Sequence, residues 1–158
     1  MTSRHRADQI DARLLLALTE HPRATTIALA DRTGLSRNTV QARMSKLEEN
    51  GALATFERRV DPGTLGYPLK AFLLANVTQR RLTQVAAALD GIPEVLEVHG
   101  LSGAADLLVQ VVARNADDLY RVTGRILDIK GVKRTTTALV MRELVDYRIE
   151  PLLRRLAQ

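Results

Sequence analysis

GLSRNTVQARMSKLEENG, residues 34–51, runs between two glycines and gathers its cations and amides on one side. Ser36 is a favoured N-cap residue, and the closing Asn-Gly pair is a typical helix end. Between them Val40, Met44 and Leu47 recur at helical spacing and predict a buried stripe. The stretch therefore predicts an amphipathic helix whose opposite face is free for polar contacts.

Two more short helices are predicted before this one. Asp8 or Asp11 is placed to begin the first, and Thr25 or Thr26 is placed to begin the second. The corner TGLS then joins the second helix to the third, and Gly34 permits the left-handed backbone that such a corner needs. Three short helices with a tight corner are the outline of a helix-turn-helix unit.

In a helix-turn-helix the second helix of the pair enters the major groove of DNA. Arg37 has the donors to pair with guanine, and Asn38 and Gln41 can pair with adenine. Arg43, at the edge of the same face, is expected to contact phosphate. A solvated helix of a small bundle would show a similar face, and the glycine corner favours DNA binding over it. The candidate DNA contacts are Ser36, Arg37, Asn38, Thr39, Gln41, Arg43 and Lys46, with Thr26 and Arg32 from the preceding helix.

The pattern changes after residue 51. ALATFERRV, residues 52–60, is expected to form a short strand, and DPGTLGYP, residues 61–68, has the prolines and glycines of a linker. Beyond it strand-like and helix-like segments alternate in the order β-α-β-β-α-β, and LLANV at 73–77 resembles LLVQV at 107–111. Such a doubled βαβ unit predicts a ferredoxin-like sheet with both helices on one face.

The sequence thus predicts an α+β protein with a winged helix-turn-helix domain and a βαββαβ domain. The predicted division is a DNA-binding domain at 1–60, a linker at 61–68, an αβ domain at 69–145 and a tail at 146–158. The second sheet face would be apolar and uncovered, which predicts a homodimer built through this domain. The alternative is that tail residues 149–156 cover this face in a monomer.

Composition narrows the class of protein. The 158 residues include no cysteine and carry a net charge of +5, with no signal-peptide pattern or membrane-length apolar run, so a cytoplasmic protein is expected. His5, His21 and His99 lack metal-ligand spacing, and neither a phosphate-binding glycine loop nor a serine-nucleophile motif is present. We therefore expect no enzyme, no metal and no cofactor.

Several stretches together resemble the Lrp/AsnC (feast/famine) family of transcription regulators. They are TTIALADRTGLSRNTVQARMSKLEENGAL, VDPGTLGY, IPEV, SGAADLLVQV and KGVKRTTTALV, in this order along nearly the whole chain. The resemblance implies a winged helix-turn-helix domain that binds double-stranded DNA, joined to an effector-sensing and oligomerising domain of the RAM type. It also implies dimers that assemble further into tetramers, octamers or larger particles.

In that family a small molecule, commonly an amino acid, binds near the loop between the second and third strands of the αβ domain. The corresponding stretch here is HGLSGAAD, residues 99–106, where the glycines expose backbone groups, Ser102 offers a hydroxyl and Asp106 could pair with an ammonium group. An ordinary turn in which Asp106 satisfies loop amides is the plainer alternative. The candidate effector residues are His99, Gly100, Leu101, Ser102, Gly103, Asp106, Thr135 and Thr137.

Two other functions fit the same architecture. Sirohaem decarboxylases resemble Lrp/AsnC proteins in both domains, but the basic recognition helix argues against an enzyme. A DNA-organising protein with little sequence preference is the other alternative. The pair Ala104-Ala105 stands where relatives often carry a larger polar or aromatic residue, which leaves the identity and existence of an effector open.

Overall fold

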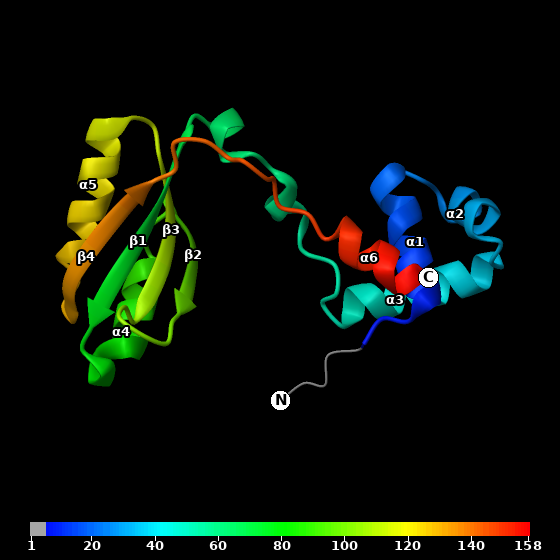
Figure 1. The fold of residues 1–158 in the computed structure, drawn as a ribbon, viewed down its shortest axis with the longest axis horizontal. Coiled ribbons are helices and arrows are strands. Elements are labelled where there is room, and N and C mark those ends of the chain that lie inside the picture. The colour runs from blue at the N-terminus through cyan, green and yellow to red at the C-terminus, as the bar shows by residue number, and fades with distance from the viewer. Residues whose placement is uncertain (1–5) are drawn as a thin grey trace. The chain divides into compact units, whose positions relative to one another are not determined.

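The computed structural model describes residues 6–158 and divides into two compact units, each described here by itself (Figure 1). The first unit contains the chain up to Arg58 together with Val145–Gln158, and the second contains Arg59–Leu144. The predicted linker at 61–68 therefore lies in the second unit, and the predicted tail at 146–158 lies in the first. His5 lies outside the described residues.

The first unit is a bundle of helices. They are α1 (Gln9–Glu20), α2 (Thr26–Thr33), α3 (Arg37–Glu49) and α6 (Glu150–Ala157). Helices α2 and α3 form the predicted helix-turn-helix, and the corner residue Gly34 has a φ of 70°, in the left-handed region. The predicted role of this glycine is thereby confirmed.

Each helix of the predicted trio begins at a capping residue. The Asp8 carboxylate accepts the N–H groups of Ile10 and Asp11 while the Asp11 carboxylate accepts the N–H of Asp8, which makes a reciprocal capping box. Thr25 and Ser36 cap α2 and α3 through their hydroxyl oxygens. Such caps satisfy backbone donors that the first turn of a helix leaves free.

The core of this unit joins the faces that the apolar spacing predicted. Its buried side chains are Leu14, Leu29, Ala30 and Val40, with Met44 packed against them. Helix α6 packs along α1 and buries Leu153, whereas Leu152 is 64% exposed. The tail is therefore part of the helical unit and does not form a cover of the sheet.

The strand expected in residues 52–60 is wrong. Phe56–Arg59 forms a 3-10 turn, and Pro62–Leu65 forms another. All four described strands pair with one another in the second unit, so this segment has no strand beside it to supply ladder hydrogen bonds. The short turn instead satisfies the backbone locally, as in the 3.2 Å bond from the Arg58 N–H to the Thr55 carbonyl.

The second unit is the predicted βαββαβ fold. Its elements are β1 (Leu69–Val77), a 3-10 turn (Gln79–Arg81), α4 (Leu82–Asp90), β2 (Val95–Gly100), β3 (Leu107–Ala113), α5 (Ala116–Leu127) and β4 (Val132–Leu139). The sheet is antiparallel with the order β2-β3-β1-β4. The central strands β1 and β3 are the two segments whose sequences resemble each other. The α+β class is confirmed.

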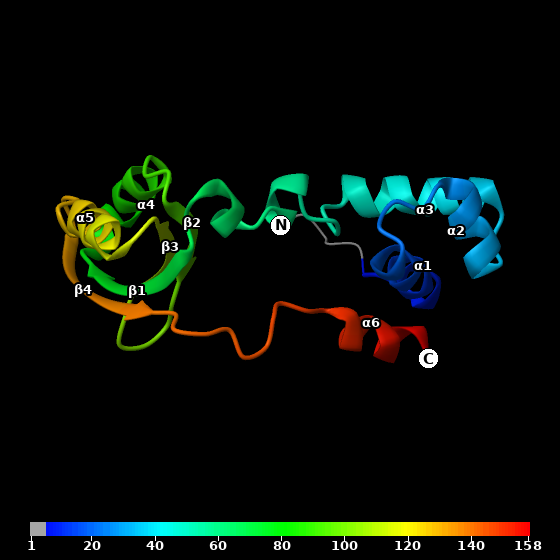
Figure 2. The ribbon, with the colours of Figure 1, turned by 90° about the horizontal axis from the view of Figure 1, so that it is seen from above.

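Helices α4 and α5 both lie on the concave face of the sheet (Figure 2). The core between sheet and helices contains Ala71, Leu73, Ala75, Val77, Val85, Leu89, Val109, Val111, Val122 and Ile126. From Ala71 onward, every second residue of β1 belongs to this core, which is the alternation expected of a strand covered on one side.

The opposite face of the sheet, which we call the open face, carries the alternate residues. Register places Leu74 directly opposite Leu108, Phe72 opposite Gln110 and Thr136 beside Leu74. Leu74 is 40% exposed. No described helix of this unit packs on the open face, so its apolar side chains have no intramolecular cover in this unit (Figure 2).

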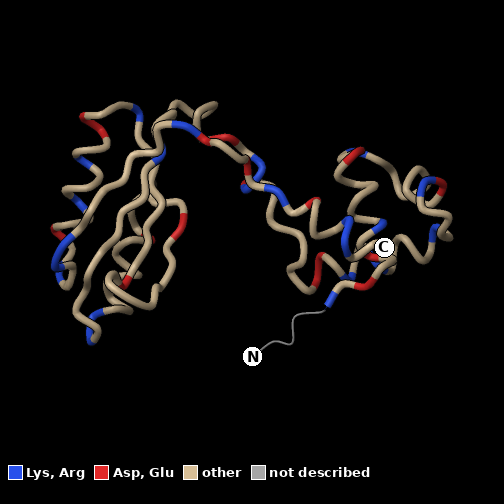
Figure 3. Tube along the Cα trace, in the orientation of Figure 1, with Lys and Arg blue, Asp and Glu red and all other residues tan. Residues whose placement is uncertain are grey.

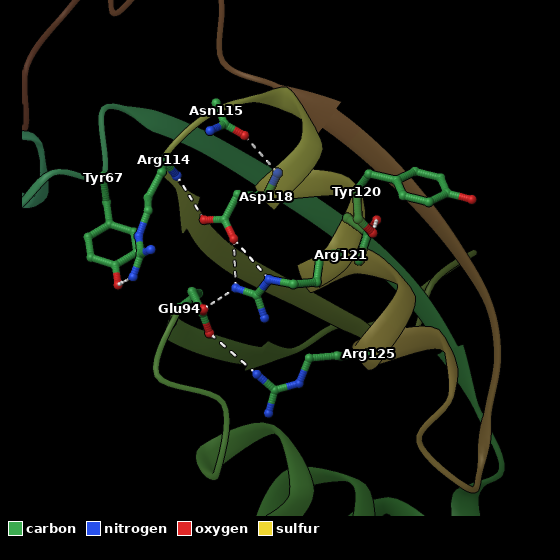
Figure 4. A network of polar contacts seen from close by, with 9 residues as sticks. Tyr67, Glu94, Arg114, Asn115, Asp118, Tyr120, Arg121 and Arg125 are labelled. Atoms are coloured by element: carbon green, nitrogen blue, oxygen red, sulfur yellow. Dashed lines mark hydrogen bonds and ion pairs between the residues drawn. The ribbon is translucent and has the colours of Figure 1, made fainter.

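A polar network ties the start of α5 to two neighbouring segments (Figure 4). Asp118 accepts the Arg114 N–H at 2.9 Å and the Arg121 Nε at 2.9 Å, and Arg121 also donates to Glu94. Burial alone would raise the pKa of Glu94, but the hydrogen bond from Arg121, a backbone hydrogen bond and the charges of Arg121 and Arg125 together lower the net pKa below its usual value. Arg114 donates to the Tyr67 hydroxyl at 3.2 Å, which fixes the residues just before β1.

Candidate DNA-binding helix and effector loop

The first half of α3 presents the predicted base-reading side chains to solvent. Arg37, Asn38 and Gln41 are exposed, while Val40 on the other side is fully buried. Arg37 forms no ion pair with another described residue, so its guanidinium keeps all its donors. Free donors and amides on an exposed helix N-terminal half are what base-edge recognition in the major groove requires.

Three of the remaining candidates differ in their exposure to solvent. Lys46 and Arg32 are exposed, and Thr26 is half-buried in the first turn of α2. Ser36 and Thr39 have a structural task as well, because the Ser36 hydroxyl accepts the Thr39 N–H at 3.1 Å and lies 2.8 Å from the Thr39 hydroxyl. Ser36 and Thr39 therefore stabilise the start of α3, the helix that carries the predicted base-reading side chains.

Arg43 occupies a different environment from the other candidates. Its Nη1 lies 2.7 Å from Asp8 Oδ2 and 2.8 Å from Asp11 Oδ1, so its charge is engaged within the protein. The hydrogen bond from Arg43 is the main reason why the pKa of Asp8 falls to about 2. The structure thus places the guanidinium of Arg43 as a bridge from α3 to the capping box of α1.

The loop between β2 and β3 contains most of the predicted effector residues and is fastened to β1. The Leu101 N–H donates to the Asp106 carbonyl at 2.8 Å, and the Asp106 N–H donates to the Ala75 carbonyl at 3.0 Å. Gly103 has a φ of 114°, a backbone conformation that favours glycine. Gly100, Leu101, Ser102 and Gly103 are exposed, so the loop offers accessible backbone and hydroxyl groups.

Asp106 uses both carboxylate oxygens inside the chain. Oδ2 accepts the Val77 N–H at 2.8 Å, and Oδ1 accepts the Gln79 side-chain amide at 2.9 Å. Asn76 adds a bond to the Ala104 carbonyl at 2.8 Å. The anchors Asn76 and Gln79 were not predicted, because they lie nearly thirty positions from the loop and no sequence spacing relates them to it.

The other predicted effector residues lie on two faces of the sheet. Thr135 and Thr137 pair with Ala75 and Leu73, whose side chains face the helices. His99 pairs with Leu108 on the open face and lies 3.2 Å from a Glu97 carboxylate oxygen. Thr135 shares the end of the sheet with the loop, whereas Thr137 and His99 are not brought together.

Residues 6–158 show neither a metal centre nor a membrane-spanning helix. This part of the chain contains no cluster of three or more metal-ligating side chains. Nor does any helix in it have the length and apolar character needed to cross a membrane. These two observations concern the described residues alone.

Family models match both parts of the chain. A winged helix-turn-helix DNA-binding domain matches residues 8–53, and an Lrp/AsnC ligand binding domain matches residues 70–149. The chain belongs to the Lrp/AsnC family.

Individual Lrp/AsnC proteins extend the likeness over most of the chain. It is 32% identical over 135 residues to the HTH-type transcriptional regulator FL11 of Pyrococcus horikoshii, covering 85% of this chain and 89% of that protein. The structure of Escherichia coli AsnC matches with a TM-score of 0.83 and 26% identity, covering 93% of this chain and all of that one. A feast or famine regulatory protein from Mycobacterium tuberculosis, complexed with L-methionine, matches with a TM-score of 0.78 and 29% identity over 90% and 97% of the two chains.

These likenesses agree with the geometry of both units. The chain is a DNA-binding transcriptional regulator of the Lrp/AsnC family, with a winged helix-turn-helix and an αβ domain of the ligand-binding type. The resemblance predicted from the sequence is confirmed. The residues that contact DNA or an effector remain predictions.

Proposed function

We propose that this regulator reads specific DNA sites with the first half of α3, as a homodimer formed through the open face of its sheet. The observation that carries the first part is the exposure of Arg37, Asn38 and Gln41 on one helix whose opposite side is anchored in the core. In a dimer two such helices would enter successive major grooves, with half-sites about 34 Å apart or a multiple of that spacing. Ser36, Thr39, Lys46, Thr26 and Arg32 would contact phosphates or orient the helix.

Selection of bound fragments from genomic DNA by the purified protein tests this proposal. Arg37→Ala and Gln41→Ala are expected to weaken the selected site by about tenfold or more, because one bidentate base contact contributes about 1–3 kcal/mol of discrimination. Arg142→Ala, which removes an exposed cation from the segment after β4, serves as the control. Equal losses on selected and random DNA would contradict the assignment of base readers. Smooth coverage of all fragments would favour a DNA-organising protein.

The open face supports the dimer because its central side chains are apolar and uncovered. Leu74 and Leu108 lie opposite each other at its centre, with Phe72 on the same face. A contiguous apolar face in a soluble protein usually meets a partner, and a twofold axis lets one face serve both subunits.

A charge placed on the open face should therefore separate the subunits. Leu74→Asp is expected to give monomers in sedimentation equilibrium at concentrations where the unchanged protein is dimeric. Leu127→Asp is the matched control, since Leu127 is 46% exposed, close to the 40% of Leu74, but lies at the end of α5. A dimer that survives Leu74→Asp and dissociates with Leu127→Asp would place the interface elsewhere. Assembly beyond the dimer, to tetramers or octamers, belongs to the same proposal.

The β2–β3 loop is the proposed place for a small amino-acid effector. Exposed backbone at Gly100 and Gly103 and the Ser102 hydroxyl supply hydrogen-bonding groups, and the M. tuberculosis relative was solved with L-methionine. An ammonium group would have to share the Asp106 carboxylate with Val77 and Gln79. Leu101 from the loop and Thr135 from β4 would line the site, whereas Thr137 and His99 are not brought to the loop within one chain.

A thermal-shift screen of the amino acids, including L-methionine, tests this effector site. A hit is expected to be reduced in Ser102→Ala, which removes only a hydroxyl that makes no hydrogen bond with another described residue. Asp106→Ala is a less clean variant because it also releases the loop from β1. If no amino acid shifts the unfolding temperature of the unchanged protein, the effector proposal fails for this class of ligand.

The same proposal covers enzymatic activity, cellular location and the boundaries of the functional segments. We propose that the protein is not an enzyme, needs no metal or cofactor and works in the cytoplasm. Turnover of sirohaem by the purified protein, with no affinity for DNA, would overturn the first statement. The functional division at 1–60, 61–68, 69–145 and 146–158 is proposed to describe which residues act together during regulation.

A further inference from the structure

A shallow pocket lies at the end of the sheet domain where β1 ends and α4 begins. It has a volume of about 430 Å³ and is lined by Thr78, Arg80, Arg81 and Gln84. Each of these four side chains can donate hydrogen bonds. None of them is a carboxylate. This lining is suited to an anion.

The loop before β4 packs against two of the residues that line the pocket. The Thr78 N–H donates to the Gly131 carbonyl at 2.8 Å, which joins the loop to the pocket wall. At Gly131 a Cβ would lie 3.0 Å from both Arg81 Cβ and Val85 Cγ2, so the backbone packs directly against the stem of Arg81. The position of Arg81 is therefore fixed by close packing even though its charge is accessible.

The charges around this pocket are not compensated by the chain. Arg80 and Arg81 form no ion pair with any residue in 6–158, and Lys130 and Lys133, which flank Gly131, form none either. Figure 3 shows Lys and Arg where β1 ends and where β4 begins. The neighbouring residue Gln79 donates its side-chain amide to Asp106, so this carboxylate is already engaged.

We propose that this pocket binds the phosphoryl group of a small phosphorylated metabolite. Arg80 and Arg81 would hold the phosphoryl oxygens, because guanidinium groups bind such oxygens through paired hydrogen bonds. Thr78 and Gln84 would contact the rest of the ligand. Because the pocket is shallow, the rest of the ligand would stay partly in solvent and the charged phosphoryl group would supply most of the contact. This ligand would bind independently of the amino-acid site proposed for the β2–β3 loop.

Calorimetric titration of the full-length protein tests the site, with pyrophosphate and AMP as probes and adenosine as the phosphate-free match for AMP. One saturable site per chain is expected for AMP or pyrophosphate, and none for adenosine. R80Q/R81Q is expected to weaken binding at least tenfold. R142Q/R148Q is the matched control, because it removes the same charge from exposed positions after β4 and should leave binding unchanged.

The variants are first compared by circular dichroism, so that only folded proteins with equal unfolding midpoints are titrated. Absence of binding by the unchanged protein, or an equal loss in both double variants, would overturn the proposal. The same proteins are also titrated with random-sequence duplex DNA. If R80Q/R81Q weakens DNA binding and the small phosphates never bind, these cations serve the DNA backbone and the metabolite site is refuted.

Discussion

Arg43 shows how a single side chain can tie α3 to the start of α1 through its charge. Its guanidinium joins α3 to Asp8 and to Asp11, whose side chain is 2% exposed. Burial would raise the pKa of Asp11, but the Asp8 N–H and Arg43 more than compensate, and the net pKa is lowered. Removing the cation would take the Arg43 ion pair away from this buried carboxylate and leave it the Asp8 N–H.

Arg43→Ala should therefore destabilise the helical unit by about 2 kcal/mol, since it removes the cation that is hydrogen-bonded to a buried carboxylate. Arg37→Ala, on the same helix but exposed, should change the free energy of unfolding by less than about 0.5 kcal/mol. Urea unfolding followed by circular dichroism measures both values. If Arg43→Ala proved as harmless as Arg37→Ala, the bridge would contribute nothing to the fold.

The same bridge predicts an acid dependence. The pKa of Asp8 is lowered from 3.8 to about 2, so the folded state holds its proton less tightly than the unfolded state. The resulting stabilisation is fully present above about pH 4 and is lost as the pH falls towards 2. Unfolding measured over this interval should show a shallower loss of stability in Arg43→Ala than in the unchanged protein. Parallel curves would exclude this carboxylate as a source of the acid sensitivity.

The sequence predicted which side chains of α3 are exposed, but it could not predict this bridge. Helical spacing alone separates Arg37 and Gln41 from Val40, because all three positions belong to one helix. Arg43 is 35 positions from Asp8. Only the folded packing of α1 against α3 reveals that its charge is used inside the protein, and the same holds for Asn76 and Gln79 around the effector loop.

At the scale of elements, the turn before β4 requires glycine at residue 131. Gly131 has a φ of 115°, and a Cβ there would come 3.0 Å from Arg81 and Val85. Gly131→Ala is thus expected to destabilise the sheet domain by about 1–3 kcal/mol. Gly124→Ala, inside α5 with nothing within 4 Å of the new Cβ, should instead stabilise by about 0.5–1 kcal/mol. Thermal unfolding of the two variants should shift in opposite directions.

Helix α6 gives a second contrast within one element. Leu153 is 9% exposed and Leu152 is 64% exposed, although they are neighbours. Leu153→Ala should cost about 2 kcal/mol or more, whereas Leu152→Ala should be nearly neutral. Hydrogen exchange should locate the loss in α1 and α6. Equal effects of the two substitutions would show that α6 is not packed through this side.

The order of the strands and helices in the sheet unit was predictable from the sequence. The structure of residues 52–60 and the packing of α6 were not. The likeness of LLANV to LLVQV indicated the two strands that became β1 and β3. The strand expected at 52–60 lacked a partner, which no local pattern could disclose. Helix α6 carried its own signals, an acidic first turn with proline and arginines in the last turn, but its packing partner lay far away in the sequence.

At the scale of the whole molecule, the chain leaves the helical unit at residue 58 and returns to it at residue 145. The core of the sheet unit lies entirely between these crossings. A fragment spanning 59–144 should therefore fold cooperatively by itself. A fragment ending at residue 58 should be less stable than one in which 145–158 are joined to it by a short linker. Circular dichroism melts of the fragments test this, and a fragment 59–144 without a cooperative melt would contradict it.

This nested connectivity has a consequence for recombination. A ligand-sensing cassette can be exchanged between relatives only by cutting at two points, near residues 59 and 144, because a single crossover would give α1 a foreign α6. Hybrids made with one junction would combine α1 and α6 from different proteins, whereas hybrids made with two junctions would keep the whole helical unit from one protein. Laboratory evolution of new specificities in this scaffold should accordingly favour internal replacement over end-to-end fusion.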